Sequence, residues 1–79
     1  MVVSAYTLIR TEHSKRDELV NKIKKLKLVK EVASVYGEYD IVVKTETNSI
    51  EELTLFIYNE LRKIRGLATT TTMITFRKK

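Results

Sequence analysis

One short stretch of the chain combines a glycine, an aromatic residue and a carboxylate. Gly37-Glu38-Tyr39-Asp40 falls where a tight turn would lead into an apolar run, and Gly37 permits a positive φ and a close backbone approach there. Asp40 is the most informative residue, because a carboxylate at the mouth of a strand can receive an ammonium group. The same carboxylate could instead accept hydrogen bonds from the amides of its own turn, and both interpretations stay open.

Four consecutive threonines, Thr69 to Thr72, form the second candidate. Because alternate side chains of a strand point to opposite sides of the sheet, Thr70 and Thr72 share one face and could present two hydroxyls to a ligand. Threonine is also a favoured strand residue. The run is therefore explained by β-propensity alone unless a ligand lies beside it.

A third candidate lies on a segment with helical spacing. Leu55, Tyr58 and Arg62 recur at i, i+3 and i+7, which gives this segment a second, half-apolar face beside its main apolar stripe. Tyrosine and arginine are enriched at interfaces. The segment ends near the start of the threonine strand, which would bring Tyr58 and Arg62 toward Thr70 and Thr72. An ordinary solvated helix flank explains the same pattern.

The sequence motifs of enzymes and metal sites are absent. There is no glycine-rich dinucleotide loop, no phosphate-binding loop and no set of nucleophile, base and acid. Zero cysteines and a single histidine, His13, exclude disulfide scaffolds, thiol catalysis, iron–sulfur clusters and zinc fingers. We expect no catalytic residues, no metal and no cofactor, and interpret His13 as a loop residue.

Length and charge limit the classes of protein and of binding partner that remain possible. The 79 residues make one domain, 1–79, and a core this small contributes only about 3–5 kcal/mol, which favours an oligomer. A net charge of +5 permits a nucleic-acid or acidic-lipid partner. No signal peptide or membrane-length apolar run is present, so we expect a cytoplasmic protein that does not engage membranes.

A lysine cluster is the strongest argument for a nucleic-acid partner. A solvated helix face with long flexible side chains explains it as well. Residues 22–30 contain no acidic residue and five lysines: Lys22, Lys24, Lys25, Lys27 and Lys30.

The spacing of apolar residues predicts the elements that position these candidates. Runs of β-branched and aromatic residues predict strands over 2–11, 29–36, 39–46 and 67–76. Capping residues and helical spacing predict a first helix over about 15–26, after Ser14, and a second whose buried stripe begins at Ile50. Gly37-Glu38 is expected to connect a hairpin, and Gly66 to form the C-cap of the second helix.

The resulting order is β-α-β-β-α-β, the ferredoxin-like α+β arrangement of a four-stranded antiparallel sheet with two helices on one face. The uncovered face of such a sheet should be polar in a monomer. Here Val42 would lie on that face, joined either by Val29, Ala33 and Val35 or by Val32 and Tyr36. The simplest cover is a second copy of the sheet, which predicts a homodimer of the dimeric α/β-barrel type.

The element order and two sequence stretches together resemble the effector-binding (RAM) domain of the Lrp/AsnC feast/famine regulators over essentially the whole chain. The stretches are VYGEYD at 35–40 and RKIRGLATTTTMITF at 62–76. Their specific marks are a Gly-x-Tyr-Asp turn and a Gly-Leu pair followed by Thr-x-Thr. Arg65 stands where the family often has proline.

The resemblance implies a domain that dimerises through its sheets, assembles into rings such as octamers made of four dimers, and binds amino acids near the contacts between dimers. It implies effector-binding roles for Gly37, Tyr39, Asp40, Thr70 and Thr72. To these we add Tyr58 and Arg62 as candidates for effector specificity.

The expected function is a stand-alone amino-acid-sensing and oligomerisation module, because the chain begins directly at its first strand with no helix-turn-helix. It would regulate transcription or amino-acid metabolism through full-length Lrp/AsnC-type partners and would not bind specific DNA sequences itself. Two other functions stay open. A small basic nucleic-acid-binding protein would use the lysine cluster, although no stretch matches the aromatic-rich ribonucleoprotein signature. An enzyme of the dimeric α/β-barrel type would lack a base and cofactor ligands.

Overall fold

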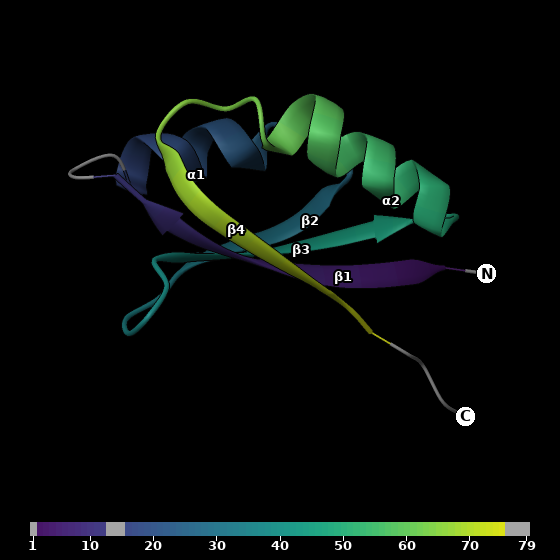
Figure 1. Ribbon diagram of the computed structural model, residues 1–79, viewed down its shortest axis with the longest axis horizontal. Helices are drawn as coiled ribbons and strands as arrows, with labels where there is room; N and C mark the ends of the chain where they lie inside the picture. The colour runs from purple at the N-terminus through teal and green to yellow at the C-terminus, as the bar shows by residue number, and fades with distance from the viewer. Residues whose placement is uncertain (1, 13–15, 76–79) are drawn as a thin grey trace.

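Four antiparallel strands form one sheet in the order β2-β3-β1-β4, and both helical segments cover the same face of it (Figure 1). The structure is a computed structural model that describes residues 2–12 and 16–75. The elements in chain order are β1 (Val3–Thr11), α1 (Arg16–Lys24), β2 (Val29–Ser34), β3 (Ile41–Thr47), α2 (Ile50–Phe56), the π-helical turn η1 (Ile57–Leu61) and β4 (Leu67–Ile74). This is the predicted ferredoxin-like arrangement.

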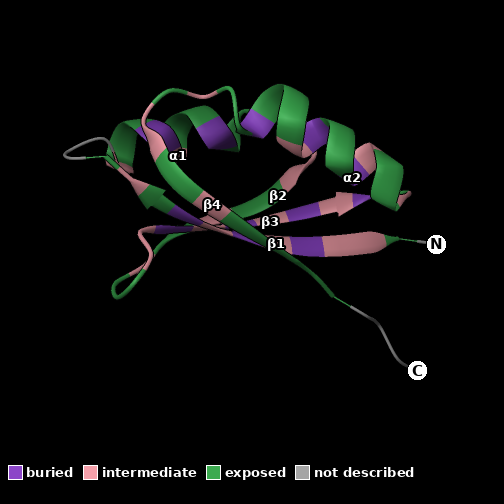
Figure 2. Ribbon diagram, in the orientation of Figure 1, coloured by how far each residue is buried: buried purple, intermediate pink, exposed green. Residues whose placement is uncertain are grey.

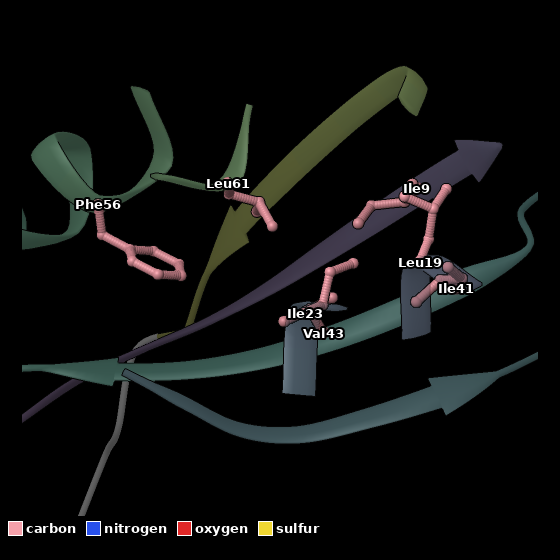
Figure 3. Packing of buried hydrophobic residues seen from close by; sticks show 7 residues of the cluster. All are labelled: Ile9, Leu19, Ile23, Ile41, Val43, Phe56 and Leu61. Carbon is pink, nitrogen blue, oxygen red and sulfur yellow. The ribbon is translucent and has the colours of Figure 1, made fainter. Parts of the chain in front are cut away.

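The core lies between the sheet and the helices. Odd-numbered residues of β1 and β3 point toward the helices, and Ala5, Thr7, Ile9, Ile41 and Val43 are completely buried there. Figure 2 shows this layer of buried positions along the two central strands and on the facing sides of the helices. Figure 3 shows how the buried side chains meet; the cluster comprises Ile9, Leu19, Ile23, Ile41, Val43, Phe56 and Leu61.

The start of α2 is fixed by two side-chain hydrogen bonds around the predicted capping residues. The Ser49 hydroxyl accepts a hydrogen bond from the backbone N–H of Glu52 at 3.1 Å. The Glu52 carboxylate accepts one from the backbone N–H of Asn48 at 2.8 Å. The first contact satisfies a donor that the first helical turn leaves free, and the second holds the residue that precedes the N-cap.

The second helix changes its pitch halfway along. After Phe56 it widens into the π-helical turn η1, closed by a 2.9 Å hydrogen bond from the Arg62 N–H to the Ile57 carbonyl. A π turn holds one more residue than an α turn, so it rotates the following side chains relative to an α-helix. Leu61, at the end of this turn, is completely buried, as its place in the apolar stripe predicts.

Several predicted details of the second helix and of the last strand are wrong. Ile50 is 56 % exposed, so the buried stripe begins at Leu53 instead. The helix ends at Leu61, with Arg62 as its C-cap, and not at Gly66, which has a positive φ of 101° but lies at the entry to β4. The last strand ends at Ile74, two residues earlier than predicted.

The hairpin and the first helix also differ from expectation. β2 and β3 are joined by the six residues 35–40, closed by a 2.9 Å hydrogen bond from the Val35 N–H to the Asp40 carbonyl, where a two-residue connection was expected. α1 ends at Lys24, so Leu26 packs against the core from the following turn. His13 and Ser14 lie outside the described residues.

The face of the sheet away from the helices is partly apolar. Leu8 pairs with Val42 and Val42 with Ala33, so these three share that face, together with Tyr6 and the half-exposed Met73. A register shift at Lys30 places Val29 and Val32 together on the helix side, where both pack against the core. The sequence allowed two groups of residues beside Val42 on the open face, and neither prediction is fully correct. Ala33 lies beside Val42, whereas Val29 and Val32 lie on the other face.

Candidate functional site

The turn that carries Gly37, Tyr39 and Asp40 is attached to the end of β1. Gly37 has a φ of 123°, a region that side-chain-bearing residues rarely adopt, and an added Cβ would meet no atom within 4 Å. Glycine is therefore required for its backbone angle and not for space. The Asp40 N–H donates to the Ile9 carbonyl at 2.8 Å, which joins the turn to β1.

The Asp40 carboxylate binds β1 and not the amides of its own turn. Its Oδ2 accepts hydrogen bonds from the backbone N–H of Thr11 at 2.8 Å and from the Thr11 hydroxyl at 3.3 Å. Within the described part of the chain, its Oδ1 has no hydrogen bond. The side chain is half-buried. One oxygen thus holds the turn in place while the other is available to a cationic or N–H-bearing ligand.

Arg10 fastens the same turn from the neighbouring position on β1. Its guanidinium lies 3.6 Å from the Glu38 carboxylate and 5.6 Å from the centre of the Tyr39 ring. Both the arginine and the glutamate are largely exposed, so the ion pair itself adds little stability. Its effect is to hold the Tyr39 ring against β1 by a cation–π contact.

The two threonines share a face, as predicted, and that face is the one that carries the helices. Thr72 pairs with Thr7 across the β1–β4 ladder, and their hydroxyl oxygens lie 3.1 Å apart. Thr70 pairs with Ile9 and is half-buried, with no hydrogen bond to its hydroxyl among the described residues. β4 is an edge strand, so both hydroxyls lie beside a free edge of the sheet.

Ile9 is the residue that relates the turn to the threonines. It pairs with Ile41, which directly follows Asp40, on one side, and with Thr70 on the other. Two strand spacings therefore separate Ile41 from Thr70, about 9–10 Å between backbones. The structure brings the two predicted groups to the same end of the sheet but leaves β1 between them.

A hollow of about 310 Å³ lies beside this end of β1. It is lined by two carboxylates, two cationic side chains, an apolar residue and a glycine: Glu12, Glu18, Lys22, Arg65, Leu19 and Gly66. None of the five predicted effector-binding residues lines it. In a single copy of the chain, this hollow and the predicted site are therefore separate features.

Tyr58 in η1 and Arg62 directly after it lie on the outward surface of the second helical segment. The guanidinium of Arg62 stacks 5.1 Å from the centre of the Tyr58 ring, and both residues are exposed. No hydrogen bond or ion pair between described residues joins them to the turn or to the threonines.

The lysine cluster is exposed along the end of α1, the following turn and the start of β2. Lys22 forms an ion pair with Glu18 at 3.7 Å, one helical turn earlier. In residues 2–12 and 16–75 no group of three potential metal ligands is present. No helix of this described part is long and apolar enough to cross a membrane.

Sequence reasoning missed Thr11 and Arg10, the two residues that hold the candidate turn. Both precede it by about thirty positions, and nothing in their local pattern distinguishes them from ordinary strand residues. They could be found only after β1 and β3 were aligned as neighbours, because Ile9 then lies opposite Ile41.

Comparison with known proteins matches residues 4–79 to a family described as the Lrp/AsnC ligand binding domain. The transcriptional regulator FL11 of Pyrococcus furiosus, of HTH type, is 35 % identical over 75 residues, which cover 95 % of this chain and 49 % of the regulator. The solved structure of the hypothetical protein PHS023 from Pyrococcus horikoshii has 38 % identity and a TM-score of 0.90, covering 96 % of this chain and 92 % of that one.

A regulator from Neisseria meningitidis, NMB0573, solved as a complex with L-Met, shares the fold with a TM-score of 0.86 at 14 % identity. The match covers 96 % of this chain and 51 % of the regulator. The chain belongs to the Lrp/AsnC family and is a ligand-binding (RAM) domain of it. It spans about half the length of the curated relatives it matches, all of which are transcriptional regulators of HTH type.

Proposed function

We propose that this chain is a module that senses an amino-acid effector and mediates oligomerisation in the control of transcription or amino-acid metabolism. The observation that carries the proposal is the match of residues 4–79 to a family of ligand-binding domains, combined with a turn in which one carboxylate oxygen of Asp40 has no hydrogen bond to a described residue. The L-Met complex of the Neisseria regulator, a protein of the same fold, supports an amino acid as the effector class.

In this proposal the effector binds to Gly37, Tyr39 and Asp40 in the turn and to Thr70 and Thr72 on β4. The carboxylate of Asp40 would receive the ammonium group, and the two hydroxyls would bind polar atoms of the ligand. Because β1 separates the two groups within one copy, a site between copies would complete it. Two copies would pair through their open sheet faces, and such dimers would assemble further into a ring such as an octamer.

The module would act in the cytoplasm through partner regulators of the same family, without recognising DNA sequences itself. It would need no metal, cofactor or catalytic residue. A basic nucleic-acid-binding function would instead rest on the lysine cluster, and it predicts binding that falls steeply as salt is raised.

A thermal-shift screen against the twenty amino acids tests the proposal, because a ligand of the folded state raises its stability by RT ln(1 + [L]/Kd). We expect at least one amino acid to raise the melting temperature. Thr70→Val should reduce that rise while leaving the unliganded protein as stable, because the Thr70 hydroxyl has no hydrogen bond among the described residues. Thr71→Val, on the opposite face of β4, is the matched control. If no amino acid shifts the transition, the effector assignment is wrong.

Tyr58 and Arg62 are proposed to tune which effector is accepted. Arg62 would favour an acidic or polar ligand over a basic one, and Tyr58 would supply an apolar wall that ends in a hydroxyl. Calorimetry on Tyr58→Ala and Arg62→Ala with acidic, polar and basic amino acids tests this role. An unchanged order of affinities in both variants would remove these residues from the effector site.

A further inference from the structure

The outward face of α2 and η1 carries large side chains that none of residues 2–12 and 16–75 covers. Leu55 is 61 % exposed and Tyr58 58 % exposed. Glu51 and Arg62, both exposed, extend this row at its two ends. All four side chains lie on the surface turned away from the buried Leu53, Phe56 and Leu61. Glu51 and Leu55 are one α-helical turn apart. The Arg62 guanidinium, beyond the π turn, lies 5.1 Å from the centre of the Tyr58 ring, which keeps it in the same row.

The two inner side chains of this row are largely apolar, and the two outer ones carry opposite charges. The midpoint of the row is the bond between Phe56 and Ile57. Leu55 and Tyr58 flank these two residues at a distance of one position. Glu51 and Arg62 flank them at a distance of five positions. If a second copy of the segment is laid antiparallel over the first, each Leu55 meets a Tyr58 and each Glu51 meets an Arg62. Apolar groups thus meet at the centre, and opposite charges meet at both ends.

We propose that this face is a contact between two copies of the chain, packed antiparallel about a two-fold axis near the Phe56–Ile57 bond. A two-fold contact requires a surface that is complementary to itself, and this row of side chains has that property. Antiparallel packing also places the positive end of one helix dipole beside the negative end of the other. The Arg62 guanidinium, already stacked on Tyr58, is positioned to reach the partner carboxylate.

This contact is a second surface, on the opposite side of the molecule from the open sheet face. The seven residues of α2 and the five of η1 bury less area in such a pairing than the roughly 1,200–2,000 Å² of a stable interface. Alone it would therefore be weak and concentration-dependent. Combined with the sheet-mediated dimer proposed above, it would link dimers into larger assemblies, because two contacts in one assembly strengthen each other. It does not depend on effector binding.

Reversal and exchange of the two charges test the proposal. The average mass in solution is measured by sedimentation equilibrium from about 10 μM to 1 mM, a range suited to weak contacts. Glu51→Arg and Arg62→Glu should each lower the average mass at high concentration by about twofold or more, because like charges then meet at both ends. The double variant Glu51→Arg/Arg62→Glu should restore the wild-type mass.

Asp17→Arg and Lys25→Glu on the exposed surface of α1 are matched controls, since they make the same charge changes in a comparable first turn and just after a helix. These controls should leave the mass unchanged, and circular dichroism should show that all variants are folded. The proposal is overturned if the single reversals leave the mass of folded protein unchanged, or if the double variant stays as dissociated as the single ones. The second outcome would indicate a different partner for this face.

Discussion

Asp40 and Thr11 are joined by two hydrogen bonds that tie the turn between β2 and β3 to the end of β1. One carboxylate oxygen accepts from both the backbone N–H and the hydroxyl of Thr11, at 2.8 and 3.3 Å. The sequence left open whether Asp40 caps its own turn or receives a ligand. The contact shows a third role, in which the carboxylate joins two segments 29 positions apart.

We expect Asp40→Ala to lower the free energy of unfolding by about 1.5–3 kcal/mol, the usual range for hydrogen bonds to a charged group. Thr11→Val should cost less, because it removes the weaker hydroxyl bond and keeps the backbone one. In the Asp40→Ala background, Thr11→Val should cost almost nothing, since its polar partner is already gone. Urea unfolding of the four proteins measures this coupling. Fully additive costs would show that the two residues stabilise the fold independently.

Thr45 offers a stability test in the centre of the sheet. It is completely buried, and its hydroxyl has no hydrogen-bond partner in the described part of the chain. Val has nearly the same shape without the hydroxyl, so Thr45→Val should raise the free energy of unfolding by about 1–2 kcal/mol. Thr47→Val is the matched control, because the Thr47 hydroxyl donates to the Ser49 carbonyl at 2.7 Å, and it should destabilise. Equal effects of the two changes in urea unfolding would contradict this explanation.

Gly37→Ala should destabilise the protein through backbone angle alone. An alanine held at a φ of 123° is strained by about 1–3 kcal/mol, whereas the added methyl group would meet no neighbour. Thermal unfolding measures the cost. The alanine could escape the strain by rearranging the turn, and NMR shifts of Tyr39 and Asp40 would detect that. A variant as stable as the parent, with unchanged shifts, would show that the turn does not require glycine.

The element order and the alternation of β1 and β3 could be predicted from sequence, and buried positions do alternate with half-buried ones along β3 and the middle of β1. The positive φ of Gly37 also followed from its place in a turn. The C-cap role predicted for Gly66 was wrong, since the helix ends earlier, at Leu61, with Arg62 as its C-cap. The burial of Leu61 follows from its helical spacing to Leu53 and Ile57, as predicted. The π turn over Ile57–Leu61 has no local sequence signal and was not predicted.

The candidate site also has features that the sequence predicts and features that it does not. Turn chemistry identified Gly37 and Asp40, and strand alternation correctly put Thr70 and Thr72 on one face. Which face they occupy depends on the register of β4 against β1, which the threonine run itself does not encode, because all four of its residues are alike. The register shift at Lys30 could not be predicted either. It moves Val29 to the helix side of the sheet, and no nearby residue type indicates it.

Val42 provides the last test, of the proposed pairing through the open sheet face. It lies between Leu8 and Ala33 on that face, with Met73 and Tyr6 farther along β4 and β1. A lysine at this position would carry a charge into the contact with a second sheet, between the apolar Leu8 and Ala33. In a single copy the same lysine would reach solvent, so the variant should stay folded. Light scattering at micromolar concentration should therefore show an average mass lower by about twofold or more than that of the parent.

Asn21→Lys on the exposed surface of α1 adds the same charge away from the open face and should keep the parent mass. Circular dichroism of Val42→Lys separates dissociation from unfolding, because a dissociated but folded chain retains its helix and strand signal. A parent protein that is monomeric across this concentration range would remove the sheet-mediated dimer from the proposal. A folded Val42→Lys variant with the parent mass would place the contact elsewhere, and the outward face of α2 would then be the first surface to examine.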